Sequence, residues 1–435
     1  MGKIYEKNTG YTLLKPIVDW NLRHSYRKVE VKGYENIPSD GALLFTPNHC
    51  NTLMDALVML RANRGITVFG ARADMFNNPL IAKIMHFLRI LPMVRQRDGL
   101  RNVLKNHETN DIIVEILEND AAFCMYPEGR HRPAHSLLTL GKGAFRAALS
   151  ANARFGDRKP VYIIPVGIEY GDYFRYRSNA LVTYGKAINV TEFVKSLEVE
   201  NEVQMIEPLR HELAQRMSGL ITYIKDDDDY ADKWTLTKIL ALDTKGKLSE
   251  KMEANRRIVA GIESACETRP EAMKDILAKA GRFEKTRRKA GISIYSFRKG
   301  NGLLRVLWKT IAAAAGLPYY IYSALISLPM WALETFIRGK VKDRAFRNTV
   351  SFGVKLGLGL IMGLIWAILS FCLISCPWCA LASFLLTIPT YSFFHDYNEF
   401  LRRLISDMKL LCNGKLKEFH KEIVNEYKNL KQTSK

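Results

Sequence analysis

Short apolar runs alternate with amphipathic stretches along roughly the first 190 residues of the chain. Apolar runs of about four to eight residues predict strands at 28–31, 42–46, 67–70, 89–95, 121–126, 161–168 and 180–184. Apolar positions at helical spacing predict helices at 11–26, 52–61, 79–87, 102–118 and 142–151. Strands that alternate with helices are typical of α/β folds, so we expect a mixed sheet flanked by helices.

Apolar residues dominate a later part of the chain, in three runs at 311–336, 352–374 and 378–394. The first two exceed the roughly 20 residues that cross the hydrocarbon core of a bilayer, and the third is close to the lower limit. Pro377 separates the last two runs, which therefore form either a tight hairpin or one long kinked helix. Tryptophan and tyrosine residues along these runs favour membrane spans over a buried pair of helices in a soluble core. We expect two to three transmembrane helices.

The remaining stretches predict helices of a different character. Apolar residues of the helix at 11–26 share one face, and this face either packs on the core or lies on a membrane surface. Residues 192–290 predict highly charged helices, for which the pattern indicates no chemical role. The last residues, 401–435, predict a charged C-terminal helix.

Net charge indicates the kind of partner. The formal net charge is +20 and the isoelectric point is about 9.5. Such a charge suits nucleic acid, an anionic membrane surface or phosphorylated substrates. The apolar block excludes nucleic acid as the expected partner, because a nucleic-acid-binding protein has no need of it.

Targeting signals and cysteines indicate the compartment. The N-terminal stretch lacks a sustained apolar core and a small-residue cleavage site, so we expect no signal peptide and a catalytic domain on the cytosolic side. Seven scattered cysteines argue against a disulfide framework. Histidines do not cluster with cysteines or carboxylates at ligand spacing, so no metal is expected.

The stretch "TPNHCNTLMDAL" (46–57) places a histidine and an aspartate at the start of a helix. The apolar run before it predicts a buried strand that Pro47 ends, so His49 follows the strand and Asp55 lies in the first helical turn. This is where α/β folds place their active sites. A carboxylate beside a histidine fixes its tautomer and lets the other ring nitrogen take a proton. Alone, such a pair is more often structural than catalytic.

Three further stretches follow predicted strands. "YPEGRHR" (126–132) gathers cations around a glycine turn, which suits a phosphate, although a solvated basic turn is equally consistent with it. "LPMVRQRDG" (91–99) places Arg95 after an apolar strand. "VYIIPVGIEYGD" (161–172) carries Pro165 inside an apolar strand, which indicates a strand edge beside a cleft.

Together and in this order, the four stretches resemble the glycerophospholipid acyltransferase superfamily, over about residues 29–184. Its motifs are Asn-His…Asp, a Gly…Phe…Arg block, Phe-Pro-Glu-Gly-Thr-Arg and an apolar block with proline. Five residues separate His49 from Asp55, one more than in most of the family, and this longer spacing is similar to that of fungal-type glycerol-3-phosphate and dihydroxyacetone-phosphate acyltransferases. Arg130 and His131 stand where the family has Thr-Arg, so the phosphate-binding arginine is either Arg130 or Arg132.

The resemblance implies roles for individual residues. His49 is expected to be the general base and Asp55 its orienting partner. The acceptor is expected to be held by several groups, namely Arg95, Glu128, Gly129, Arg130, Arg132 and Lys142. A backbone amide near Pro165 is expected to stabilise the oxyanion. No cofactor is implied, and the co-substrate is acyl-CoA or an acyl-carrier protein.

The resemblance also implies domain boundaries. The expected order is an amphipathic membrane-associating helix (1–28), the acyltransferase domain (29–190), a charged helical region (191–300), the transmembrane block (301–400) and the C-terminal helix (401–435). The implied partners are the lipid bilayer, an acyl thioester donor and a phosphorylated glycerol-type acceptor.

Three functions remain open at this point. The first is transfer of a fatty acyl group to glycerol-3-phosphate or dihydroxyacetone phosphate, which the His49–Asp55 spacing favours. The second is the same chemistry on lysophosphatidate or another lysophospholipid. The third is an inactive membrane-bound lipid-binding or scaffold protein, against which the intact His49 and Asp55 argue.

Overall fold

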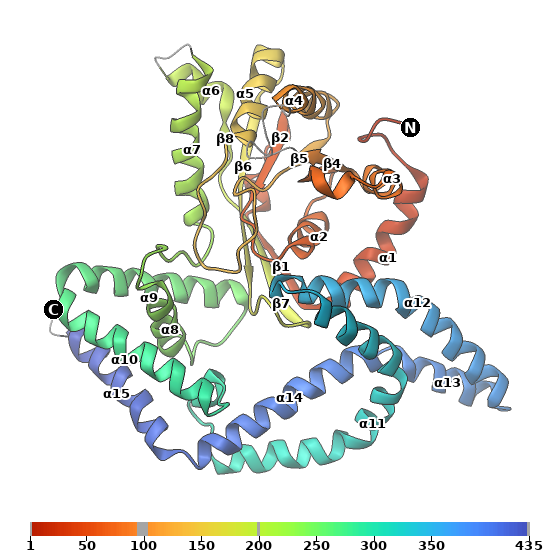
Figure 1. Cartoon of the computed structure of the whole chain (residues 1–435), viewed down its shortest axis with the longest axis vertical. Helices are drawn as coiled ribbons and strands as arrows, with labels where there is room; N and C mark the ends of the chain where they lie inside the picture. Colours follow the sequence, from red (N-terminus) through yellow and green to blue (C-terminus); the bar gives the residue numbers. More distant parts are fainter. Residues whose placement is uncertain (1, 94–102, 198–200, 433–435) are drawn as a thin grey trace. The chain divides into compact units, whose positions relative to one another are not determined.

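The computed structural model describes residues 2–93, 103–197 and 201–432 (Figure 1). The chain divides into two compact units, and the division does not follow the order of the sequence. Unit 1 comprises Met1–Ile221 together with Asp343–Thr349, and unit 2 comprises Thr222–Lys342 and Val350–Lys435. The expected charged region 191–300 is therefore not one structural unit, because its first part belongs to unit 1.

Unit 1 is built on an eight-stranded mixed sheet. The strand order is β1-β7-β6-β2-β5-β3-β4, and β8 pairs with β6. Their bounds are β1 Tyr26–Lys32, β2 Ala42–Pro47, β3 Thr67–Arg72, β4 Ile90–Met93, β5 Ala122–Cys124, β6 Val161–Tyr170, β7 Ser178–Tyr184 and β8 Ile188–Asn189. All seven predicted strands lie within two or three residues of these bounds. The mixed α/β fold is thus confirmed.

Helices cover both faces of this sheet. The helices of unit 1 are α1 Thr9–Ser25, α2 Leu53–Ala62, α3 Pro79–Phe87, α4 Val103–Glu118, α5 Gly143–Phe155, α6 Val190–Ser196 and α7 Glu202–Ser218. In Figure 1, α5 and α7 lie on one side of the sheet, and α1 and α2 lie on the other. Small and apolar residues of α5, such as Ala144, Ala148 and Ala151, are completely buried, which lets this helix approach the sheet closely.

The register of the central strands brings three chain segments to one edge of the sheet. β2 runs parallel to β5 on one side and to β6 on the other, with Phe45 opposite Cys124 and Thr46 opposite Pro165. Parallel strands end at the same edge, and α/β folds place ligands outside these carboxyl ends. The segments that follow β2 and β5 therefore meet the last residues of β6 there.

Pro165 does not mark a strand edge, so that interpretation is wrong. β6 is an interior strand, and Pro165 is buried within it. Its carbonyl accepts a hydrogen bond from the Gly185 amide at 2.9 Å, so its nitrogen faces the same side. On that side the partner of β6 changes from β8, at Ile163, to β7, at Val166. The strand tolerates a residue without N–H because the ladder is interrupted at this point.

Unit 2 is helical. Its helices are α8 Tyr230–Leu240, α9 Leu248–Thr268, α10 Pro270–Lys289, α11 Leu303–Lys340, α12 Arg347–Leu373, α13 Pro377–Thr387, α14 Thr390–Leu411 and α15 Gly414–Gln432. The first turn of α12 belongs to unit 1 by its contacts. Phe283 of α10 lies in a buried cluster with Leu236 of α8, Ile262 of α9 and Ile423 of α15. The charged helices thus form a bundle with their own core, which the sequence pattern did not indicate.

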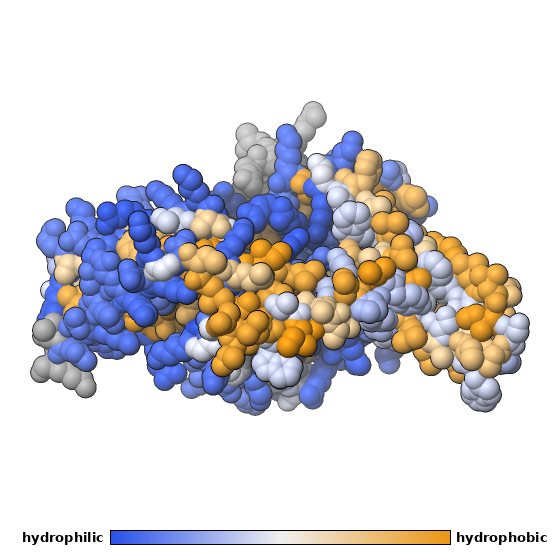
Figure 2. All heavy atoms as spheres, turned by 90° about the horizontal axis from the view of Figure 1, so that it is seen from below, coloured by the Kyte–Doolittle hydropathy of each residue, from blue (hydrophilic) through white to orange (hydrophobic). Residues whose placement is uncertain are grey.

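In the described part of the chain, two helical stretches are long and apolar enough to cross a membrane: α11 (Leu303–Lys340) and Arg344–Leu373, which combines α12 with the helical turn before it. In their most apolar windows only 22% and 11% of the residues are buried, so most of their apolar side chains face outward. Figure 2 shows hydrophobic residues gathered in broad patches on the face seen from below, where α11 lies. A third span is present if α13 and α14, which meet at a bend of 49°, cross together.

The second and third apolar runs contain two helix breaks. The first break separates the two runs: α12 ends at Leu373 and α13 begins only at Pro377, so these are separate helices rather than one kinked helix. A second break follows at Pro389, which precedes α14. Proline lacks the N–H that would continue the helix and its ring clashes with the preceding turn, which explains the break. α14 then continues to Leu411, beyond the expected boundary at residue 400.

Candidate active site

His49 and Asp55 lie together at the carboxyl end of β2. The Nδ1 atom of His49 and the Oδ2 atom of Asp55 are 2.7 Å apart. The Asp55 side chain is fully buried, whereas that of His49 is 18% exposed. The additional residue between the two positions is thus compatible with direct contact, because Asp55 lies in the first turn of α2 and points back toward the end of the strand.

The Asp55 carboxylate is held by several donors besides His49. Oδ2 accepts hydrogen bonds from the backbone amides of Cys50 (2.8 Å) and Asn51 (2.7 Å). Oδ1 accepts one from the Tyr170 hydroxyl at 2.7 Å. Burial and the nearby Asp55 charge raise the pKa values of the Tyr170 hydroxyl and the Cys50 thiol, which therefore stay protonated. A carboxylate that accepts this many hydrogen bonds is fixed in position.

The ring of His49 is fixed by a stacking contact on its face as well as by the Asp55 contact at its edge. It stacks on Tyr126, with ring centroids 4.2 Å apart and an angle of 25° between planes. The Asp55 bond uses Nδ1, and within the described part of the chain Nε2 has no hydrogen-bond partner. A neutral ring with its proton on Nδ1 offers the Nε2 lone pair to a substrate proton.

Glu128 connects two loops rather than facing open solvent. Its Oε1 atom accepts a hydrogen bond from the His49 backbone amide, and Oε2 accepts one from the Leu138 amide, both at 2.9 Å. Burial raises the pKa of Glu128, while these two amides act in the opposite direction. The sequence-based expectation was that Glu128 contacts the acceptor. In the structure both carboxylate oxygens accept hydrogen bonds from backbone amides, and contact with the acceptor stays a prediction.

Asn48 fixes the other side of the loop. Its side-chain nitrogen donates to the Ile168 carbonyl at 3.1 Å, and its oxygen accepts from the Ile168 amide at 2.6 Å. The end of β2 is thereby attached to the end of β6, which carries Tyr170. The Ile168 amide is engaged by this contact, and an oxyanion donor near Pro165 stays a prediction.

The other expected acceptor-binding residues differ in where they lie. The backbone amide of Arg132 donates to the His49 carbonyl at 2.9 Å, and its guanidinium donates to the Ser136 hydroxyl, so Arg132 lies beside the pair. Gly129, at φ +64°, forms the turn that glycine favours, and Arg130 is exposed on it. Lys142 is half-buried directly before α5, and the preceding Gly141 amide donates to the Pro127 carbonyl at 2.7 Å. Arg95 lies outside the described residues.

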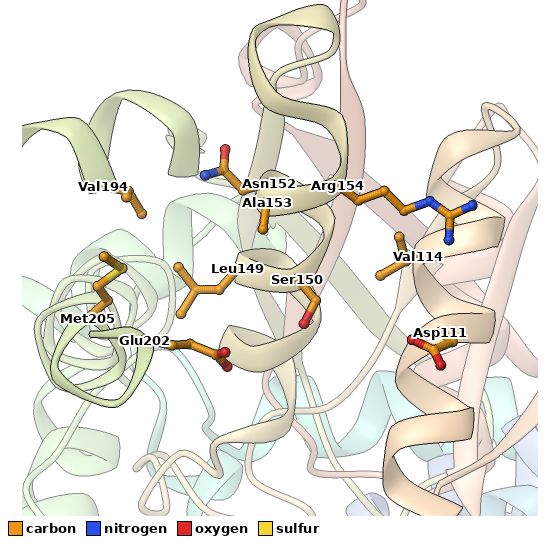
Figure 3. A pocket seen from close by; sticks show the side chains of 10 residues that line it. All are labelled: Asp111, Val114, Leu149, Ser150, Asn152, Ala153, Arg154, Val194, Glu202 and Met205. Atoms are coloured by element: carbon orange, nitrogen blue, oxygen red, sulfur yellow. The ribbon is translucent and has the colours of Figure 1, made fainter. Parts of the chain in front are cut away.

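A cavity of about 600 Å³ lies elsewhere in unit 1, among α4, α5, α6 and α7 (Figure 3). Arg154, Asp111 and Glu202 reach it, together with apolar side chains such as Leu149 and Met205. Two of its polar side chains have structural partners, since Ser150 pairs with Asn110 at 2.8 Å and Arg154 with Glu118 at 2.7 Å. Neither His49 nor Asp55 lines it, so size alone does not identify the reactive site.

Metal ligation is not indicated by the described side chains. Among the residues at 2–93, 103–197 and 201–432, no three His, Cys, Asp or Glu side chains are grouped so as to hold a metal ion. The expectation that the chain needs no metal or organic cofactor stays a prediction.

Sequence reasoning missed several residues around His49. Tyr170 has a readable signal, because it lies on the same face of β6 as Ile168 and Val166 at intervals of two residues. Tyr126 and Asn48 stood in the quoted motifs without assigned roles. Asp343, which pairs with His131 at 2.7 Å, has no sequence signal, because 212 residues separate the two.

Comparison with known proteins bears on this region. Residues 28–169 match the family model described as Acyltransferase. The match includes His49, Asp55, Glu128, Arg132 and Pro165, and it covers less than half of the chain. This part of the chain is therefore an acyltransferase-like region, in agreement with the family that the four motifs resemble.

Among curated proteins none matches the chain. Among solved structures the chain is similar to the 1-acyl-sn-glycerophosphate (LPA) acyltransferase, PlsC, from Thermotoga maritima, with 20% sequence identity and a TM-score of 0.36. That similarity covers 48% of this chain and 78% of the other.

Proposed function

We propose that this chain is a membrane-bound enzyme that moves a fatty acyl group from an acyl thioester to a hydroxyl of a phosphorylated glycerol-type acceptor. The observation that carries the proposal is the contact of His49 Nδ1 with the buried Asp55 carboxylate, inside the acyltransferase-like region. The pair leaves Nε2 as the nitrogen that can accept a proton.

The reaction needs no covalent intermediate on the protein. His49 Nε2 removes the proton from the acceptor hydroxyl as its oxygen attacks the thioester carbonyl carbon. The new C–O bond forms, the C–S bond breaks, and the departing thiolate takes the proton from the imidazolium. Asp55 holds the ring and stabilises its positive charge during the transfer.

Glycerol-3-phosphate or dihydroxyacetone phosphate is our first choice of acceptor, because the His49–Asp55 spacing is similar to that of the fungal-type enzymes. Lysophosphatidate is the alternative. In either case the phosphate would meet Arg130, Arg132 and Lys142, which lie on the loops around the pair. Arginine binds phosphate through paired N–H groups, which favours Arg132, whose backbone amide donates to the His49 carbonyl.

The two long apolar helices support membrane attachment, which suits a reaction whose donor and product both carry acyl chains. A catalytic unit on the cytosolic side is part of the proposal. All seven cysteines are free in the structure, as expected for a reducing compartment.

The decisive experiment measures acyl transfer by the purified protein in detergent, with labelled acyl-CoA and each of the three acceptors. We expect turnover of one acceptor, and a reduction of kcat by about 10²- to 10⁴-fold in His49→Ala. His211→Ala, which changes an exposed histidine of α7, is the matched control and should retain wild-type activity. Equal turnover by His49→Ala would remove His49 as the base. Inactivity of the wild type with every acceptor would favour the lipid-binding reading.

A further inference from the structure

The segment Asp343–Thr349 belongs to unit 1, although it connects α11 to α12 of unit 2. It lies more than 120 residues beyond Ile221, where the rest of unit 1 ends. It contains a short helical turn, Arg344–Phe346. Asp343 is the N-cap residue of this turn, and its side chain accepts a hydrogen bond from the Ala345 amide. Contacts of this segment therefore describe the inside of unit 1, and they converge on the loops that carry His49.

At its first residue the segment contacts the basic loop. Asp343 Oδ2 and His131 Nε2 are 2.7 Å apart, and Asp343 Oδ1 accepts a hydrogen bond from the Ala345 amide at 2.8 Å. The His131 bond is the main reason that the pKa of Asp343 lies below its usual range. The aspartate is thus an ionised acceptor whose direction is fixed by its own turn.

His131 lies between this segment and His49. Its ring meets the ring of His49 nearly edge-on, with centroids 5.6 Å apart and an angle of 77°. On its other side it meets Phe346, with centroids 5.7 Å apart and an angle of 87°. The ring of His131 is therefore packed between Phe346 and the ring of His49.

The far end of the segment contacts the helix that carries Asp55. The hydroxyls of Thr349 and Thr52 are 2.9 Å apart, and Thr52 is the residue before α2. Thr52 has φ +48°, a conformation that is unfavourable for a β-branched residue. The Asn348 side chain also donates to the Tyr173 carbonyl, just beyond β6, at 2.8 Å. One segment of seven residues thus contacts three of the loops that form the site.

We propose that Asp343–Thr349 forms one side of the acceptor site and that Asp343 is a positioning residue, which holds His131 beside His49 to contact the anionic part of the acceptor. The proposal rests on the proposed function, because it concerns binding of the phosphorylated acceptor. Asp343 keeps the Nε2 proton of His131 in place, so Nδ1 is the nitrogen that remains for the acceptor. In the protonated ring Nδ1 is also a donor, as an anionic oxygen requires.

This assignment gives a role to His131, which stands where the acyltransferase motif has a different residue. It also makes the acceptor site depend on a segment that follows α11 in the chain and leads into α12. Asp343 acts through His131 and has no reacting atom of its own to contact.

The test compares kcat and the acceptor KM for Asp343→Ala, Asp343→Asn, His131→Ala and the double variant. We expect Asp343→Ala to raise the acceptor KM roughly 5- to 10-fold, the effect of losing one charge-assisted hydrogen bond at a half-exposed site, with kcat within about twofold. Asp343→Asn keeps an oxygen acceptor for His131, so it should raise KM only about twofold. The double variant should be no worse than His131→Ala, since Asp343 acts through His131.

Asp157→Asn is the matched control, because Asp157 forms an exposed ion pair with Lys195 away from the site. It should leave KM and kcat unchanged. Binding of glycerol-3-phosphate or dihydroxyacetone phosphate, measured by calorimetry without donor, should weaken in Asp343→Ala by the same factor as KM rises.

Three results would overturn the inference while leaving the proposed function intact. They are an unchanged KM in Asp343→Ala, additive effects in the double variant, or a parallel loss of kcat and melting temperature with no specific change in KM. Activity in His49→Ala would instead contradict the role of His49 as the base. The acceptor KM values of the Asp343 and His131 variants could still be compared in that case. Failure of the wild type to turn over or bind any of the phosphorylated probes would overturn both.

Discussion

Replacement of Glu128 by glutamine tests whether this residue holds the loops or holds the acceptor. The carboxylate accepts hydrogen bonds from the His49 and Leu138 amides, each at 2.9 Å. A glutamine side chain has the same shape, but one of its two terminal atoms is an NH₂ group. That group would face a backbone N–H, so one bond is lost and a buried donor is left without a partner.

The magnitude follows from these two contacts. A hydrogen bond to a charged group contributes about 1.5–3 kcal/mol, and an unsatisfied buried donor costs about 1–3 kcal/mol. Some relaxation of the loop is expected, so we predict that Glu128→Gln lowers the free energy of unfolding by about 3 kcal/mol. For a unit of this size the melting temperature would fall by about 6–12 °C.

Activity should fall because the displaced amide belongs to His49 itself. A shift of about 1 Å in a reacting group can lower a rate about 100-fold. We therefore expect kcat to fall by about that factor, with the acceptor KM within about threefold of wild type. Glu118→Gln is the matched control, since Glu118 forms a partly exposed pair with Arg154, and it should change stability by less than about 1 kcal/mol.

The opposite pattern would refute the reasoning. If Glu128→Gln raised the acceptor KM while kcat and the melting temperature stayed at wild-type values, Glu128 would be an acceptor ligand. The sequence-based expectation would then be right, and the two backbone contacts would be incidental.

Three other variants test separate parts of the chain. Tyr170→Phe removes the hydroxyl that donates to Asp55 at 2.7 Å, and it should lower kcat about 10- to 100-fold with little change in KM; an unchanged kcat would mean that the remaining donors suffice. Burial lowers the pKa of His420 from 6.5 to about 4. Between these two pH values the unfolded chain binds more protons than the folded chain, so the free energy of unfolding should fall as the pH drops from 6.5 to about 4. The loss should reach at most about 3 kcal/mol, and His420→Phe should abolish this pH dependence in urea unfolding; a dependence that persists in the variant would have another origin. Glu334→Ala removes the acceptor of the Tyr391 and Ser351 hydroxyls and the partner of Arg338, so the melting temperature in detergent should fall, whereas Glu399→Ala, at a partly exposed pair with Arg403, should change it little.

Much of the fold of unit 1 could be predicted because its signals are local. The run at 161–168 became a strand that ends at Tyr170, and the run at 42–46 became one that ends at Pro47. Apolar periodicity determines such elements, and helix positions followed in the same way. The pairing order of the strands could not be predicted from local periodicity, because it depends on contacts between segments that are distant in the sequence.

The site was predictable to the same extent. His49 and Asp55 could be proposed as a pair since both stand next to one strand end in the sequence. The role of Glu128 as a contact between two loops could not, because nothing local distinguishes a carboxylate that binds backbone from one that binds substrate. The charged helices gave no sign of their shared core around Phe283, whose partners come from α15, far along the chain.

The discontinuity of unit 1 has a consequence for the order of events during synthesis. Ile221 leaves the ribosome long before Asp343, and at about 5–20 residues per second the interval is roughly 6–25 s. During this time the sheet, His49 and Asp55 are already made, while the residue that pairs with His131 is not. α11 is completed within the same interval, so the catalytic unit is closed only after its first long apolar helix has been synthesised. A nascent chain arrested before residue 343 should therefore present an open site.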